Sequence, residues 1–174
     1  KNKRTITTQL VNLLTYLNNI IVRNKIVNDK AKDKKRIKNI AVVVDEFHLY
    51  LKNTDSEVLL TFEQIARRIR KYHGAFIPAT QSIHDFIGDD DSVRSATAIF
   101  NNCQYQLVGM LKEDDLTTYL KLFYQNPLTD TQKEFLMQAE MGEFLLTINS
   151  KNRIRVKILA TPIEVDLMGE ELKV

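Results

Sequence analysis

The sequence predicts an α/β domain in which helices cover a parallel sheet and an antiparallel hairpin follows at the C-terminal side. Three observations indicate this fold class. The apolar run IAVVV at 40–44 is typical of a parallel strand that is buried on both faces. Strand-like and helix-like segments then alternate along the chain, as they do in βαβ units. Two strand-like segments, 144–148 and 154–159, flank the turn 149–152 as in a β-hairpin.

The composition limits the class of protein. With 174 residues, of which 44% are hydrophobic and 27% charged, the chain is long enough to form one globular domain with a core. No apolar run reaches the ~20 residues that a membrane-spanning helix needs. The single cysteine, Cys103, excludes an internal disulfide framework, and three scattered histidines argue against a zinc site. A net charge of +3 is too small to indicate nucleic-acid binding by itself.

The first part of the chain is predicted to be a helix over 5–27, because its apolar residues recur at helical spacing. The linker 28–39 follows and contains six lysines and arginines. Two readings of this linker stay open, a patch that contacts phosphate groups and a solvated loop before a buried strand. Its acids and its lack of aromatic residues favour the loop.

A second helix is predicted to begin at a capping box formed by Thr54 and Glu57 and to stop at Gly74. One face of this helix is apolar, and the other carries Arg67, Arg68, Arg70 and Lys71. A strand over 75–80 follows and ends in Gln81-Ser82. Pro78 cannot donate a hydrogen bond to a neighbouring strand, which indicates an edge or a bulge at that position.

The later elements complete the alternation. The aspartates at 89–91 lack the alternating spacing of a calcium loop, so we interpret them as a solvated loop. The tail 161–174 is acidic, and we expect it to be loosely held. Helices are predicted at 82–86, 93–100, 114–124 and 131–139, and a third strand at 103–108.

Two adjacent carboxylates, Asp45 and Glu46, follow the apolar run directly. Open α/β sheets bind their ligands at the carboxyl ends of the strands. The pattern is therefore typical of a Walker B strand, in which the first acid holds Mg²⁺ and the second orients the water that attacks the γ-phosphate of ATP. Taken alone, the same pattern is also found where an ordinary strand ends in an acidic turn.

Three segments in this order carry a resemblance to a known family. They are VVVDE at 42–46, RRIRKYHG at 67–74 and ATQS at 79–82. The set resembles the C-terminal half of the conjugative-transfer ATPases of type IV secretion systems, which are VirB-type relatives of the FtsK/HerA branch of RecA-like P-loop ATPases. The segments 101–111 and 142–158 resemble the last core strand and closing hairpin of this family. The resemblance implies a partial RecA-like P-loop NTPase core.

The resemblance also implies a role for three residues at the strand ends. Asp45 would bind Mg²⁺ through water, and Glu46 would be the catalytic base that orients the attacking water. Gln81, a neutral amide, would sense the γ-phosphate through a hydrogen bond. ATP and Mg²⁺ are the cofactors that follow from these roles.

An arginine finger is implied as well, reaching into the ATP site of a neighbouring subunit. Arg70 is the first candidate, because a guanidinium is permanently charged and its shape matches phosphoryl oxygens. Arg67 and Arg68 are alternatives that would also bind the nucleotide. All three could instead complement the dipole of their helix.

The sequence departs from the family pattern at one important point. It contains no G-x-x-x-x-G-K-S/T phosphate loop, and its five glycines are isolated. We therefore expect this chain alone to be catalytically inactive and to be part of a longer protein. The domain interpretation is a helical segment and basic linker over 1–39 that ends a helical insertion, the C-terminal part of the ATPase domain over 40–160, and a tail over 161–174.

The expected partners and location also follow from the resemblance. The intact enzyme would form a ring, with a hexamer expected, and would contact other secretion-channel and coupling proteins. It would act in the cytoplasm at the inner face of the bacterial cell membrane, driving pilus assembly or substrate export for a mobile element. The alternatives are a DNA-pumping coupling protein or translocase, with DNA bound through the linker 30–38, and a non-catalytic RecA-like assembly module.

Overall fold

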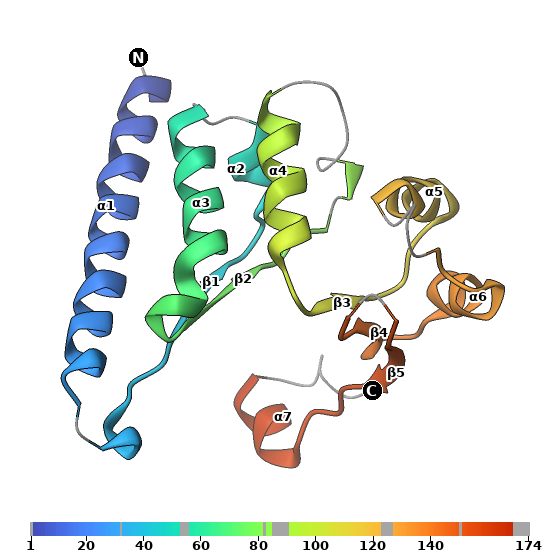
Figure 1. The fold of residues 1–174 in the computed structure, drawn as a ribbon. Helices are drawn as coiled ribbons and strands as arrows, with labels where there is room; N and C mark the ends of the chain where they lie inside the picture. The colour runs from blue at the N-terminus through green and yellow to red at the C-terminus, as the bar shows by residue number, and fades with distance from the viewer. Residues whose placement is uncertain are drawn as a thin grey trace. The chain divides into compact units, whose positions relative to one another are not determined.

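The computed structural model describes residues 2–31, 33–52, 56–81, 83–84, 91–122, 127–149 and 151–168 (Figure 1). The chain forms two compact units, residues 1–103 and 104–174. The first unit contains a parallel two-stranded sheet, and the second contains an antiparallel three-stranded sheet. The predicted mixed α/β class with a parallel sheet and a C-terminal hairpin is confirmed. The predicted domain boundaries and the RecA-like assignment stay predictions.

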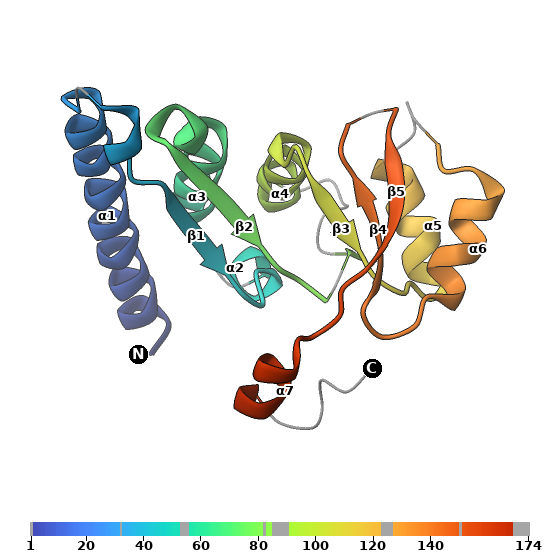
Figure 2. The same ribbon diagram turned by 90° about the horizontal axis from the view of Figure 1, so that it is seen from below.

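The first unit is built on two strands, β1 (Ile40–Val44) and β2 (Gly74–Pro78), which pair in register from Ile40 with Gly74 to Val44 with Pro78. The helices α3 and α4 pack together on one face of this sheet, and α1 lies beside α3 (Figures 1 and 2). The helical elements of this unit are α1 (Asn2–Asp29), η1 (Lys34–Arg36), α2 (His48–Lys52), α3 (Ser56–Arg68), η2 (Ile69–Tyr72) and α4 (Asp91–Asn102).

An aromatic cluster fills the space between the sheet and its helices. The ring of Phe47 is fully buried, and its centroid lies 5.2 Å from that of Phe62 and 5.9 Å from that of Phe76. Both pairs meet edge to face, which is a favoured arrangement for aromatic rings. Val42, which pairs with Phe76, is buried on the same side. The core therefore lies directly beneath the carboxyl end of β1.

The other face of this sheet is exposed in the part of the chain that the structure describes. Val43 and Ile77 are partners in register on that face, and their side chains are 65% and 48% exposed. The prediction that the first strand is buried on both faces is therefore wrong for the described residues. A continuous apolar run predicts burial on both sides, but here α3 and α4 cover one side only (Figure 2).

Gly74 provides a test of the packing at the start of β2. A Cβ atom added at this position would lie 2.6 Å from Cγ1 of Ile69, which is buried, and 3.3 Å from the backbone oxygen of Ile40. We expect Gly74→Ala to lower the free energy of unfolding by about 1–3 kcal/mol, because overpacking forces buried neighbours to move. Gly109→Ala is the matched control, since its Cβ would lie 3.4 Å from the ring of Phe144. Chemical denaturation measures both changes, and equal stability of the two variants would contradict the expected clash.

The second unit contains the strands in the order β3-β4-β5, all antiparallel. The predicted strand at 103–108 is present as β3, but it pairs with β4 and does not extend the parallel sheet. Pairing with β4 places Val108 opposite Leu145, whose side chain is 1% exposed, so burial in this unit selects the partner. The elements are β3 (Gln106–Val108), α5 (Glu113–Leu122), α6 (Asp130–Gln138), β4 (Glu143–Thr147), β5 (Arg153–Lys157) and α7 (Pro162–Met168).

The C-terminal tail contains a helix that the sequence analysis missed. The described part of the tail includes α7, but its apolar residues Ile163 and Leu167 are 70% and 80% exposed, so the expectation that the tail is loosely held stays a prediction. The backbone N–H of Thr161 donates to Oε2 of Glu164 at 2.7 Å, and the N–H of Glu164 donates to Oγ1 of Thr161 at 3.3 Å. This is a capping box, T-x-x-E, which starts a helix. The hydrogen bonds also hold the pKa of Glu164 below its ordinary value.

Some predicted features fall outside the described residues. These are the proposed cap at Thr54, most of the short helix at 82–86 and the first two aspartates of 89–91. The other predicted helices and strands are present, with ends that differ by a few residues.

Candidate functional site

The carboxyl ends of β1 and β2 are joined by backbone hydrogen bonds. The N–H of Ala79 donates to the oxygen of Val44 at 2.9 Å, and the N–H of Phe47 donates to the oxygen of Ala79 at 2.7 Å. Because alternate residues of a strand direct their backbone groups to opposite sides, Pro78 directs its nitrogen away from β1. The missing donor of Pro78 therefore does not interrupt the pairing, and the proline lies on the side that the described residues leave unpaired.

Glu46 has a left-handed backbone conformation with φ of 47°. This conformation is uncommon for residues other than glycine and requires support from its surroundings. The support comes from Phe47, whose side chain is buried in the aromatic cluster and whose N–H is bonded to Ala79. The chain thus turns sharply between β1 and α2, and the side chain of Glu46 remains 38% exposed.

The structure brings Glu46 together with Gln81, as expected for two residues that follow neighbouring parallel strands. Nε2 of Gln81 donates to Oε1 of Glu46 at 2.7 Å. Asp45 is exposed, and its Oδ1 accepts a hydrogen bond from the N–H of Glu46 at 2.8 Å. Three of the residues that the sequence analysis selected, Asp45, Glu46 and Gln81, therefore lie at one edge of the sheet.

A fourth polar residue of this edge, His48, was missed. Its Nδ1 lies 3.2 Å from Oε2 of Glu46. The signal in the sequence was a histidine two residues after the candidate base, in the segment DEFH. Spacing alone did not predict the contact, because it depends on the turn at Glu46.

The carboxylates are suitable for a magnesium ion that keeps other ligands. Carboxylate oxygens are hard ligands, and Mg²⁺ is usually held by one or two of them together with water and phosphate oxygens. Within the described ranges, no group of three or more His, Cys, Asp or Glu residues is arranged to hold a metal. The exposed carboxylate of Asp45 fits a hydrated Mg²⁺ that is also bound to a phosphate ligand. The groups that would cradle the phosphates are not in this sequence, which lacks a phosphate loop.

The three arginines lie far from Glu46 in the same chain. Their elements, α3 and η2, precede Gly74 at the start of β2, whereas Gln81 follows its end. Five residues of strand separate the two edges by about 16 Å. The described contacts differ among the three. Arg67 pairs with Glu63 at 2.6 Å, Arg68 borders a groove between α1 and α3, and Arg70 is exposed.

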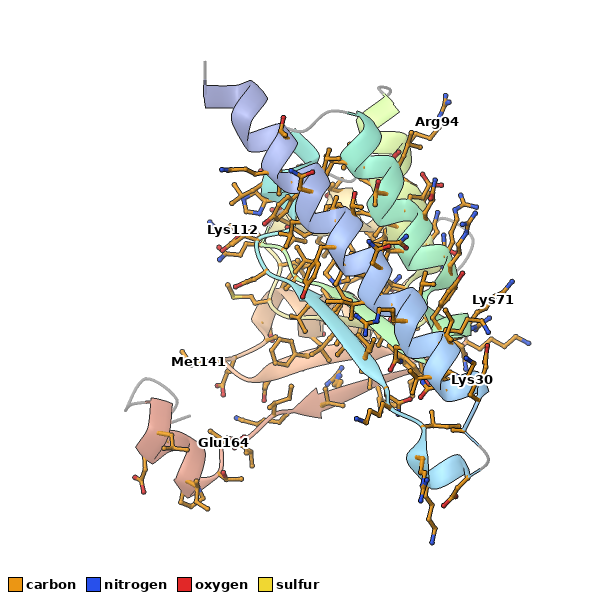
Figure 3. The ribbon with its side chains drawn as sticks, turned by 90° about the vertical axis from the view of Figure 1, so that its left-hand side faces the viewer. Lys30, Lys71, Arg94, Lys112, Met141 and Glu164 are labelled. Atoms are coloured by element: carbon orange, nitrogen blue, oxygen red, sulfur yellow. The ribbon has the colours of Figure 1, made fainter. Side chains whose placement is uncertain are left out.

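The basic linker is held against the first unit at its C-terminal end. Asn28 is buried, and its side chain donates to the backbone oxygen of Lys38 and accepts from the N–H of Lys38, at 2.8 and 2.9 Å. Asn24 donates both to the oxygen of Lys38 at 2.8 Å and to that of Tyr72 at 3.5 Å. The linker and η2 therefore meet, and Figure 3 shows Lys30 and Lys71 at the same end of the unit. This end lies at the start of β1 and β2, away from Glu46.

No protein-family model matches the chain, and no curated protein sequence is significantly similar to it. Its structure is similar to the solved structure of VirB4 of Thermoanaerobacter pseudethanolicus, with a TM-score of 0.71 and 26% sequence identity. The match covers 95% of this chain and 40% of that chain, so this chain spans well under two thirds of the VirB4 length. In the described part of the chain, no helix is long and apolar enough to cross a membrane. The comparison supports the predicted resemblance to VirB-type proteins over nearly the whole chain.

Proposed function

We propose that this chain is the C-terminal part of a VirB4-like ATPase that powers type IV secretion or conjugative transfer. The observation that carries the proposal is the hydrogen bond between Gln81 and Glu46, at the carboxyl ends of two parallel strands and beside Asp45. A carboxylate in this position can serve as a base, and a neighbouring amide can respond to what binds there. The similarity to VirB4 supports the class of protein.

In this proposal each residue has a role that follows from its position at the strand ends. Bound MgATP supplies the phosphoryl group, and its Mg²⁺ neutralises part of the phosphate charge. Asp45, at the tip of β1, holds the hydrated ion. Glu46 orients a water molecule and accepts its proton. Gln81 fixes Glu46 through Oε1 and, being at the end of β2, is placed to sense the phosphate.

The remaining parts of the site would come from outside this chain. The phosphate loop would belong to the part of the longer protein that these 174 residues do not include. The arginine finger would come from a neighbouring subunit of a ring, with a hexamer expected. Arg70 is still the first candidate, and Arg67 and Arg68, which are exposed as Arg70 is, remain alternatives. The ring would work with secretion-channel and coupling proteins at the inner face of the membrane.

A DNA-pumping translocase is the second candidate function. The observation that favours it is the cationic end of the first unit, where Asn24 bonds both to Lys38, the last residue of the linker 30–38, and to Tyr72 of η2. Contacts between lysines and phosphates weaken steeply with salt. Duplex DNA binding that falls strongly between low and physiological salt would support this candidate, and equal binding at both would exclude it.

The proposed function is tested by ATP hydrolysis of the intact protein at varied Mg²⁺ concentration. We expect hydrolysis to require Mg²⁺, and we expect Asp45→Asn to raise the Mg²⁺ concentration for half-maximal activity by about tenfold or more, because a ligand charge is lost. Asp33→Asn, in the basic linker, is the matched control and should leave the Mg²⁺ dependence unchanged. No hydrolysis by the intact protein would exclude the ATPase and favour a non-catalytic assembly module. The 174-residue chain alone should be inactive.

A further inference from the structure

We propose that His48 is a positioning residue for Glu46, which sets the rate of hydrolysis without contacting the nucleotide. The inference rests on the proposed function, since it concerns the base of the same site. Its starting point is the distance of 3.2 Å between Nδ1 of His48 and Oε2 of Glu46. The residue has no role in the sequence patterns that led to Asp45, Glu46 and Gln81.

The ring nitrogen Nδ1 of His48 is buried beside the carboxylate of Glu46. His48 is the first residue of α2, and its side chain is 21% exposed. Its Nδ1 atom is buried and makes no aligned hydrogen bond within the described part of the chain. A buried polar nitrogen without a hydrogen-bond partner is unfavourable. Oε2 of Glu46, at 3.2 Å, is within hydrogen-bond reach of this nitrogen, and alignment of the two groups would satisfy it.

His48 and Gln81 approach the carboxylate of Glu46 at different oxygens. Gln81 donates to Oε1 from the end of β2, whereas His48 faces Oε2 from the start of α2. The terminal torsion of a glutamate is broad, so a carboxylate held by one oxygen can rotate. An aligned hydrogen bond from His48 to the second oxygen would fix the plane of the carboxylate from a second element. The left-handed backbone of Glu46, held by buried Phe47, fixes the position from which the side chain starts.

The orientation of a base affects the chemical step more than it affects binding. A base must lie within hydrogen-bond reach of the proton it accepts, and a misplacement of about 1 Å can lower a rate 100-fold. Loss of the His48 contact would allow Glu46 to rotate about Gln81. We therefore expect kcat to fall while the affinity for nucleotide is kept.

Two substitutions separate positioning from simple space filling. His48→Asn can present an N–H close to the place of Nδ1, although its side chain is smaller. His48→Leu is closer to histidine in volume but has no polar atom. If His48 only filled space, the leucine variant would behave like the wild type and the asparagine variant would be the worse of the two. Positioning predicts the opposite order.

The experiment uses the intact protein and measures kcat, KM and the Kd of a non-hydrolysable ATP analogue. We expect His48→Leu to lower kcat by about 10- to 100-fold, as removal of an orienting partner does at other sites, with little change in KM or in the Kd of the analogue. His48→Asn should recover most of the lost kcat. In a Glu46→Gln background, His48→Leu should cause no further loss, because the two residues act through one contact.

The outcomes distinguish this inference from the function on which it rests. A wild-type protein that does not hydrolyse ATP would overturn the proposed function. An active wild type whose kcat is unchanged in His48→Leu would overturn the role of His48 alone. A further loss in the Glu46→Gln background would also overturn it, since His48 would then act elsewhere. If His48→Leu fails to fold, as thermal denaturation would show, the kcat of His48→Asn decides the question. A value near that of the wild type supports positioning, and a large loss in this smaller side chain would overturn it.

Discussion

Replacement of Glu46 by Gln in the intact protein is expected to lower kcat for ATP hydrolysis by about 100-fold or more, while nucleotide binding stays nearly unchanged. General-base catalysis contributes about 10²- to 10⁴-fold, and an amide cannot accept the proton of the attacking water. The substitution keeps the size of the side chain and an oxygen that can accept the hydrogen bond from Gln81. The loss should therefore fall on the chemical step, and comparison of kcat with the Kd of an ATP analogue measures it.

The matched control is Glu63→Gln on α3. This carboxylate pairs with Arg67 at 2.6 Å and lies on the helix that precedes β2, away from the carboxyl ends of the strands. We expect the control to hydrolyse ATP like the wild type. Equal turnover by Glu46→Gln and the wild type would remove Glu46 from the chemistry. It would also remove the main support for the proposed function, since the roles of Asp45 and Gln81 were assigned around that carboxylate.

Replacement of Phe47 by Ala is expected to have the largest effect on stability, a loss of about 3–5 kcal/mol in the free energy of unfolding. The ring is fully buried and has edge-to-face contacts with Phe62 and Phe76, so its removal leaves a cavity at the centre of the aromatic cluster. The backbone N–H of residue 47 keeps its bond to Ala79 in the variant, so the change reports the loss of the ring. Urea denaturation, followed by circular dichroism, measures the change.

Leu49→Ala is the control for this prediction. Leu49 lies two residues further along, on α2, and its side chain is 54% exposed, so its truncation should change stability by about 0.5 kcal/mol or less. A loss below about 1 kcal/mol for Phe47→Ala would contradict the described packing, because even a core that collapses well loses more when a phenylalanine is removed.

The core of the candidate site could be predicted from the sequence because it depends on topology alone. Asp45 and Glu46 follow a strand-like run and Gln81 was selected through the family resemblance, and parallel strands that end at the same edge of a sheet bring these three together. His48 could not be predicted in the same way. Its contact depends on the positive φ of Glu46, and nothing in the local sequence indicates that a glutamate adopts this conformation.

Some elements of the fold could be predicted from the local sequence, and others depend on distant parts of the chain. The strands, the hairpin and most helices follow from hydrophobic spacing, which is a local property. The partner of β3 does not, because pairing with β4 is decided by the burial of Leu145 in another part of the chain. The start of helix α7 has a local signal in the sequence, since Thr161 and Glu164 form a T-x-x-E capping box.

The open side of the first sheet has a practical consequence for work with the purified chain. Val43 and Ile77 expose branched hydrocarbon to water, next to a strand edge that is unpaired in the described residues. Surfaces of this kind make protein molecules adhere to one another. The colloidal behaviour of a preparation would then depend on protein concentration even when every molecule is correctly folded. Turbidity in a concentrated sample of this chain would thus report association through this exposed face of the sheet. It would not by itself indicate misfolding.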